Sequence, residues 1–134
     1  NERTAAALHE LPDPAGRLTI LSFTKQVPLY LRACDLLFSK PGGLTSTEAA
    51  VSGIPLIHTD PIPGCETVNR EYFESRGMSL SARTPEEQVQ AGLRILHDPA
   101  LRDAMLQNQH KGIHPDAADR IYDAVKAAVE RRNA

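Results

Sequence analysis

Short apolar runs alternate with helix-forming segments along most of this chain, and this alternation constrains the fold more than any other feature. Strand-forming residues fill 18–23, 36–39 and 54–58, with a possible fourth strand at 78–82. Short apolar strands separated by helices are typical of parallel βαβ units, in which helices cover both faces of the sheet. The sequence therefore predicts an α/β fold built on a parallel sheet with flanking helices.

Helix signals lie between the strands and at both ends of the chain. Helices are expected over 1–11, 27–34, 44–52, 66–76, 85–97, from 99 onward and over 115–132. Thr84 and Glu87 have the spacing of a capping box, and Gly53 suits the position just after a helix. The last helix carries an apolar face formed by Ala118, Ile121, Tyr122, Val125 and Val129.

Composition excludes several classes of function. The 134 residues carry a net charge of −2, whereas a general nucleic-acid binder needs a basic surface. Cys34 and Cys65 have neither CxxC nor zinc-ligand spacing, so we expect reduced thiols. The apolar runs are too short to span a membrane. Because no Asp-x-Asp motif occurs either, we expect neither a metal nor a cofactor.

The segment SKPGGLTSTE (39–48) follows a predicted strand and opens a predicted helix. In open parallel sheets, ligands bind beyond the carboxyl ends of the strands, where this segment lies. Gly42 and Gly43 have no side chains and let the backbone approach a ligand closely. The helix that begins near Leu44 offers unpaired N–H groups to an anion, and Thr45 adds a hydroxyl. The pattern favours a phosphate site.

A purely structural interpretation of this segment is also open. Thr45 and Glu48 fit a capping box, in which the carboxylate would fold back onto the helix start. A second segment, DPIPGCETVN (60–69), follows the next strand at the same edge and presents Glu66 and Asn69 at a helix start. Their side chains would suit sugar hydroxyls, and a helix cap is the alternative there as well.

Taken together, these residues resemble the donor-binding half of GT-B glycosyltransferases. SKPGGLTSTEAAVSGIPLI followed by PIPGCETVN is similar to monogalactosyldiacylglycerol synthases and processive diacylglycerol glucosyltransferases, and more distantly to the lipid II N-acetylglucosaminyltransferase. LSFTKQVPLYLRACDLLFS also resembles a segment of this family. The resemblance implies a Rossmann-like domain of an enzyme that transfers a hexose (glucose, galactose or N-acetylglucosamine) from a UDP-sugar to a lipid such as diacylglycerol.

The resemblance also implies a role for each matching residue. The implied contacts are Phe23 and Thr24 at the uracil, Glu48 at the ribose, Gly42, Gly43, Leu44 and Thr45 at the diphosphate, and Cys65, Glu66 and Asn69 at the sugar. Many relatives have glutamine where this chain has Cys65, which leaves the identity of the sugar open. His58 ends a strand near this edge, and we expect a hydrogen bond within the protein, with ligand contact as the alternative.

The resemblance covers nearly the whole chain but only part of such an enzyme. Residues 1–134 would form a partial donor domain, without its first strands, whose expected places lie between 18–23 and 36–39. The acceptor domain with the proposed catalytic base would precede it, so the chain alone is expected to be inactive. Helix 115–132 would pack on that domain, and unpaired strand edges would permit homo-oligomers. The full-length enzyme would be cytoplasmic, with peripheral membrane association.

Two other functions fit parts of the pattern. A UDP-N-acetylglucosamine 2-epimerase has a similar S-G-G-x-x-E-E segment, but its family expects T-x-R-P where this chain has PIPGCETVN. A non-catalytic Rossmann-like interaction module would use both segments only as helix caps. Glu48→Ala separates the module from the enzyme, because a ribose ligand affects UDP binding and a cap affects stability.

Overall fold

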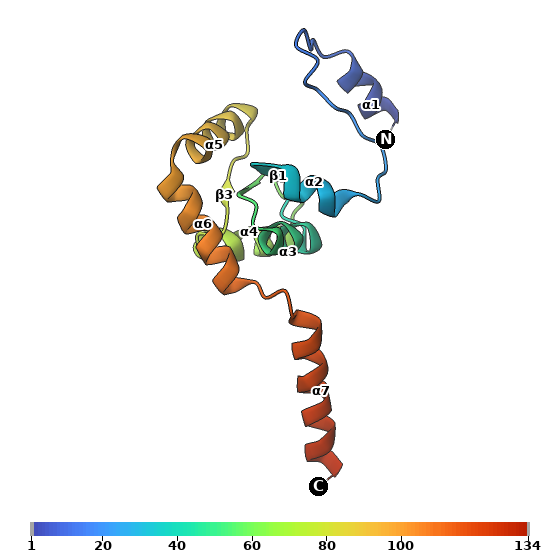
Figure 1. Cartoon of the computed structure of the whole chain (residues 1–134), viewed down its shortest axis with the longest axis vertical. Helices are drawn as coiled ribbons and strands as arrows, with labels where there is room; N and C mark the ends of the chain where they lie inside the picture. Colours follow the sequence, from blue (N-terminus) through green and yellow to red (C-terminus); the bar gives the residue numbers. More distant parts are fainter. Residues whose placement is uncertain (1, 134) are drawn as a thin grey trace.

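The computed structural model describes residues 2–133, with the side chains of residues 3–132. Asn1, the predicted start of the first helix, and Ala134 lie outside the described residues. The elements, in chain order, are α1 (Glu2–His9), α2 (Val27–Ala33), β1 (Leu37–Ser39), α3 (Gly43–Ser52), β2 (Leu56–His58), α4 (Cys65–Ser75), β3 (Leu80–Ser81), α5 (Pro85–His97), α6 (Pro99–Gly112) and α7 (Ala117–Asn133) (Figure 1).

The three strands form one parallel sheet in the order β1-β2-β3, which confirms the predicted α/β class. Leu37 lies opposite Leu56, and His58 lies opposite Ser81. The connections from β1 to β2 and from β2 to β3 contain α3 and α4 respectively. Because parallel crossovers are right-handed and the strands follow in spatial order, both helices cover the same face of the sheet.

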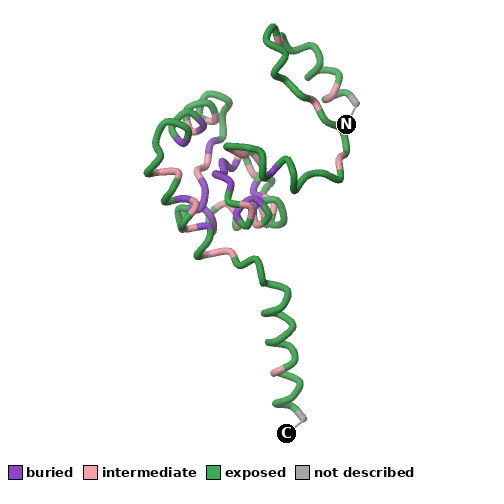
Figure 2. The backbone as a smooth tube through the Cα atoms, viewed as in Figure 1, coloured by how far each residue is buried: buried purple, intermediate pink, exposed green. Residues whose placement is uncertain are grey.

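Two apolar clusters lie on opposite faces of the sheet. Leu56 packs with Ala49 of α3 and Phe73 of α4, whereas its neighbour Ile57 packs with Ile95 of α5. Successive side chains of a strand point to opposite faces, so these two residues of β2 anchor one cluster each. The buried residues gather around the sheet in Figure 2.

Most helix boundaries follow the local signals in the sequence. The Thr84 hydroxyl accepts a hydrogen bond from the Glu87 backbone N–H at 3.2 Å, and the Glu87 carboxylate accepts one from the Thr84 N–H at 3.2 Å. This capping box begins α5 where it was predicted. Asp98 caps α6 through the Leu101 N–H at 3.0 Å. Gly53 ends α3 in the left-handed region at φ 70°, as expected.

The predicted strand 18–23 is wrong, because no described strand lies beside it. The sheet of the described residues ends at β1, and 18–23 has no regular secondary structure. A strand needs a neighbour for its backbone N–H and C=O groups. Leu18, Leu21 and Phe23 remain exposed. The segment therefore has strand-forming side chains but pairs with no described strand of the sheet.

The two ends of the chain extend away from the sheet (Figure 1). α1 is joined to α2 by a long segment, and α7 leaves the body after α6 as a separate helix. The predicted apolar face of the last helix lies in solvent: Ile121 is 65% and Tyr122 68% exposed. The helix begins at Ala117, two residues later than predicted, because Pro115 lies in a turn.

Candidate functional site

The glycine turn after β1 leads directly into α3. Gly42 is the N-cap, with φ −70° and ψ 138°, and no side chain caps the helix. The Gly42 N–H donates to the Lys40 carbonyl at 2.8 Å, and the next N–H with a backbone partner is that of Ser46, which donates to the Gly42 carbonyl at 3.0 Å. The N–H groups of Gly43, Leu44 and Thr45 belong to the first turn, which has no intrahelical acceptors. The helix start is therefore open to an anion.

The capping-box interpretation of Thr45 and Glu48 is wrong. α3 begins at Gly43, two residues before Thr45, so both residues lie inside the helix. The Glu48 side chain is exposed and has no hydrogen bond or ion pair within the described residues. It follows Gly43 by five residues, which corresponds to about 7.5 Å along the helix axis. A free carboxylate thus lies just over one turn beyond the open helix start.

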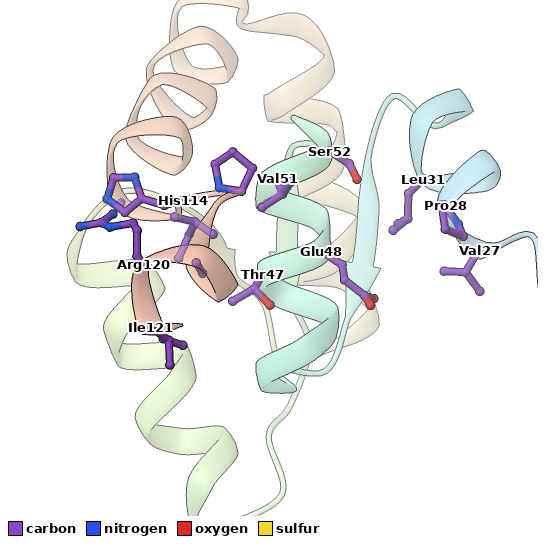
Figure 3. Close-up of a pocket in the computed structure, with 14 residues that line it drawn as sticks. Val27, Pro28, Leu31, Thr47, Glu48, Val51, Ser52, His114, Arg120 and Ile121 are labelled. Atoms are coloured by element: carbon purple, nitrogen blue, oxygen red, sulfur yellow. The ribbon is translucent and has the colours of Figure 1, made fainter. Parts of the chain in front are cut away.

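Glu48 also lines a cavity of about 870 Å³ over the outer face of α3. Figure 3 shows its carboxylate directed toward α2, where Val27 and Pro28 form the opposite wall. The remaining lining residues are mostly apolar: Leu31, Thr47, Val51, Ser52, Gly112, Ile113, His114, Pro115, Ala117, Arg120 and Ile121. The link between α6 and α7 thus forms another wall, a feature with no signal in the sequence motifs.

The residues predicted to contact the uracil, Phe23 and Thr24, come just before the segment that forms the α2 wall of the cavity. Phe23 is 88% exposed, and the Thr24 hydroxyl accepts a hydrogen bond from the Gln26 N–H at 3.1 Å. Val27, the first residue of α2, lines the cavity itself. This segment therefore ends at the cavity wall opposite Glu48, and the Phe23 ring lies in solvent.

The second predicted segment forms the start of α4. Gly64 is its N-cap at φ 112°, a conformation that favours glycine. The Glu66 carboxylate accepts a hydrogen bond from the Ile62 N–H at 2.6 Å, which closes the preceding loop. Cys65 is exposed at the first position of the helix. One Glu66 oxygen is thus occupied by the loop, while the thiol is accessible.

Asn69 joins the two predicted segments. Its amide Nδ2 donates to the Pro41 carbonyl at 3.0 Å, so the start of α4 is tied to the glycine turn before α3. A Cβ atom added to Gly43 would lie 3.7 Å from the same nitrogen, an ordinary contact distance. No clash inside the protein therefore requires a glycine at position 43. The bare backbone there remains available to a ligand.

His58 lies beneath this edge as a buried hydrogen-bonded residue. Its Nε2 is 3.0 Å from the Ser46 hydroxyl, and its Nδ1 is 3.2 Å from the Ser79 hydroxyl. Burial, and secondly the charge of Arg70, lowers the pKa of His58 to about 4. The ring is fully buried and neutral at pH 7, so its expected role within the protein is confirmed. Sequence patterns give no signal for its two serine partners.

We also searched the described residues for a metal site, a membrane-spanning helix and reactive thiols. In residues 2–133 no three histidine, cysteine or acidic side chains are grouped to hold a metal ion. None of the helices in that range has the length and apolar character of a membrane span. Cys34 and Cys65 are both exposed free thiols.

Comparison with known proteins assigns the chain to a family. The family model described as "Glycosyl transferases group 1" matches residues 6–112, a range that includes the sheet, the glycine turn and the start of α4. The chain belongs to this glycosyltransferase family. The resemblance deduced from the two motifs is thereby confirmed, and the three-stranded parallel sheet agrees with the Rossmann-like domain that it implied.

Several curated relatives are bacterial enzymes named "Processive diacylglycerol beta-glucosyltransferase". The Staphylococcus carnosus protein is 35% identical over 98 residues, which cover 73% of this chain and 25% of the relative. The Bacillus pumilus protein is 33% identical over the same coverage. The Bacillus subtilis protein is 33% identical over 92 residues, or 69% of this chain and 24% of the relative. The chain thus spans about a quarter of the length of these relatives.

Proposed function

We propose that this chain forms the donor-binding part of a UDP-sugar-dependent hexosyltransferase with a lipid acceptor such as diacylglycerol. The hydrogen bond between Asn69 and Pro41 carries the proposal, because it joins the two segments that would hold the donor. The names of the relatives support a glucose donor and a diacylglycerol acceptor. The module with both segments as helix caps is less well supported, since no side chain caps α3 or α4 at its N-cap residue.

The donor would lie along α3. Its diphosphate would meet the open N–H groups at Gly43, Leu44 and Thr45, and the ribose hydroxyls would donate to Glu48. The rise of about 7.5 Å along the axis from the helix start to Glu48 suits adjacent parts of one nucleotide. Transfer breaks the bond between the sugar and the diphosphate and forms one between the sugar and the acceptor hydroxyl oxygen, whose proton would pass to the base of the acceptor domain. The positive helix end would stabilise the charge that grows on the diphosphate leaving group.

The remaining contacts complete the donor site. The uracil would lie near the backbone of Phe23 and Thr24, beside the α2 wall of the cavity. The sugar would lie near Cys65, Glu66 and Asn69 at the start of α4. The Cys65 thiol is a weaker hydrogen-bond donor than a glutamine amide. Glu66 and Asn69 would therefore determine which hexose is preferred.

Catalysis requires an acceptor domain as well as this donor part. The exposed apolar face of α7 would pack on that domain, which would supply the catalytic base and hold the lipid. The complete enzyme would be a cytoplasmic protein with peripheral membrane association. The chain alone would not transfer sugar. The free edge of β1 would allow two copies to associate.

Glu48→Ala tests the donor site in this chain. We expect about tenfold weaker UDP and uridine binding, because one charge-assisted contact to the ribose is lost. The melting temperature should hardly change, since the Glu48 carboxylate has no bond within the described residues. NMR titration at millimolar ligand measures the affinities, and Glu71→Ala, an exposed carboxylate on α4, is the matched control. Unchanged UDP and uridine affinity in Glu48→Ala would refute the assignment.

A further inference from the structure

Two buried polar atoms at the carboxyl end of the sheet have no hydrogen-bond partner within the described residues. They are Arg70 Nε and Ser81 Oγ. A third such atom, Gln109 Oε1, lies at the amino end of the strands, where the Gln109 amide donates to the Ile54 and Met78 carbonyls. An unpaired buried polar group is costly, and native proteins satisfy almost all of them. The first two atoms therefore need a partner beyond the described residues, which a ligand or a water molecule would supply.

Arg70 and Ser81 lie on one face of the sheet, next to His58. Ser81 is in register with His58, so the two side chains point to the same face. Arg70 lies one helical turn before Phe73, whose ring meets the His58 ring edge-on at a centroid distance of 5.5 Å. Because α4 starts at the carboxyl end of β2, Arg70 is nearer than Phe73 to the edge where the candidate donor site lies.

The same part of α4 contacts the glycine turn. Asn69, the residue before Arg70, donates to the Pro41 carbonyl at 3.0 Å. Arg70 itself is only partly buried, so a ligand can reach the outer part of its guanidinium. The cation thus belongs to the helix turn that borders the open start of α3.

Arg70 forms no ion pair with a carboxylate in the part of the chain that the structure describes. Within the described residues the ion pair is between Arg102 and Asp103, far along the chain on α6. His58, whose pKa is lowered in part by the charge of Arg70, is neutral at pH 7 and supplies no compensating charge. A partly buried cation without an anion is unfavourable. An anionic ligand would supply both the missing charge and the missing acceptor for Nε.

We propose that Arg70 is a phosphate-binding residue of the donor site, with the Ser81 hydroxyl as a second donor beneath it. The proposal rests on the proposed function for its ligand, the diphosphate of a UDP-sugar. Arg70 adds a side-chain cation to an anion site otherwise made of backbone N–H groups. Arg70 also makes the site select UDP over uridine, because its guanidinium binds the phosphates and makes no contact with the nucleoside.

The test compares UDP with uridine on variants of this chain. Arg70→Met keeps an unbranched apolar side chain that reaches about as far as Nε and removes the charged guanidinium, and Arg70→Lys keeps the charge. Arg76→Met is the matched control, since Arg76 is the C-cap residue of the same helix and its guanidinium stacks on the Tyr72 ring at 3.8 Å. We expect Arg70→Met to weaken UDP binding about ten- to a hundredfold and uridine binding by less than about twofold. Arg70→Lys should lose less, and Arg76→Met should match the wild type.

Other results would overturn the proposal. UDP affinity that survives Arg70→Met would show that a water molecule, not a phosphate, completes the site. An equal loss for UDP and uridine would show that Arg70 only supports the fold. Wild-type chain that binds neither ligand would refute the proposed function instead. In that case titration with inorganic pyrophosphate decides: binding that disappears in Arg70→Met supports the anion site, and no binding refutes it.

Discussion

His58 makes the stability of this protein sensitive to acid. The ring is fully buried between Ser46 and Ser79, and burial lowers its pKa to about 4 from an ordinary value of 6.5. Between these values the unfolded chain binds a proton at this residue and the folded chain does not. Stability therefore falls as the pH falls from 6.5 toward 4, and it is fully present above pH 6.5.

The size of the effect follows from the two pKa values. Their difference corresponds to roughly 3 kcal/mol of unfolding free energy at the acid end of the range. This is a large part of the stability of a domain of this size. Because the two serine hydroxyls lie on different elements, protonation of His58 would disturb the contact of α3 with the segment before β3.

Urea unfolding at a series of pH values between 7.5 and 4.5 measures this contribution. In His58→Gln, which has no group that titrates in this range, the slope of stability against pH should be smaller than in the wild type by up to one proton. His110→Gln, at an exposed position on α6, is the control and should keep the wild-type slope. A His58→Gln variant with the full wild-type slope would refute the assignment of the acid sensitivity to this residue.

Two further substitutions test the elements around the site. Thr84→Ala should lower the unfolding free energy by about 1 kcal/mol, because α5 loses its capping box, and an unchanged urea midpoint would contradict this. Asn69→Ala should cost about 1 kcal/mol through the lost bond to Pro41 and should also weaken UDP binding, because the glycine turn is no longer fixed. NMR titration measures the UDP affinity of Asn69→Ala. An unchanged affinity would show that the glycine turn does not contribute to UDP binding.

Local signals determined much of this protein. Short apolar runs predicted β1 and β2, the Thr84 capping box predicted the start of α5, and Gly53 predicted the end of α3. These features depend on residues close together in the chain, so the sequence carries them directly. The two motifs also identified the family, because their residue types and spacing are specific.

Tertiary structure decided what depends on distant neighbours. The segment 18–23 has strand-forming residues but no strand, since pairing depends on a neighbouring strand. Thr45 and Glu48 match a capping box by spacing, yet α3 begins earlier because Gly42 follows β1 and serves as the cap. Packing brought Ser46 and Ser79 to His58, and it left the Arg70 Nε without an acceptor among the described residues. Hydrogen bonding between segments far apart in sequence is a property of the packed fold, so no local pattern predicts it.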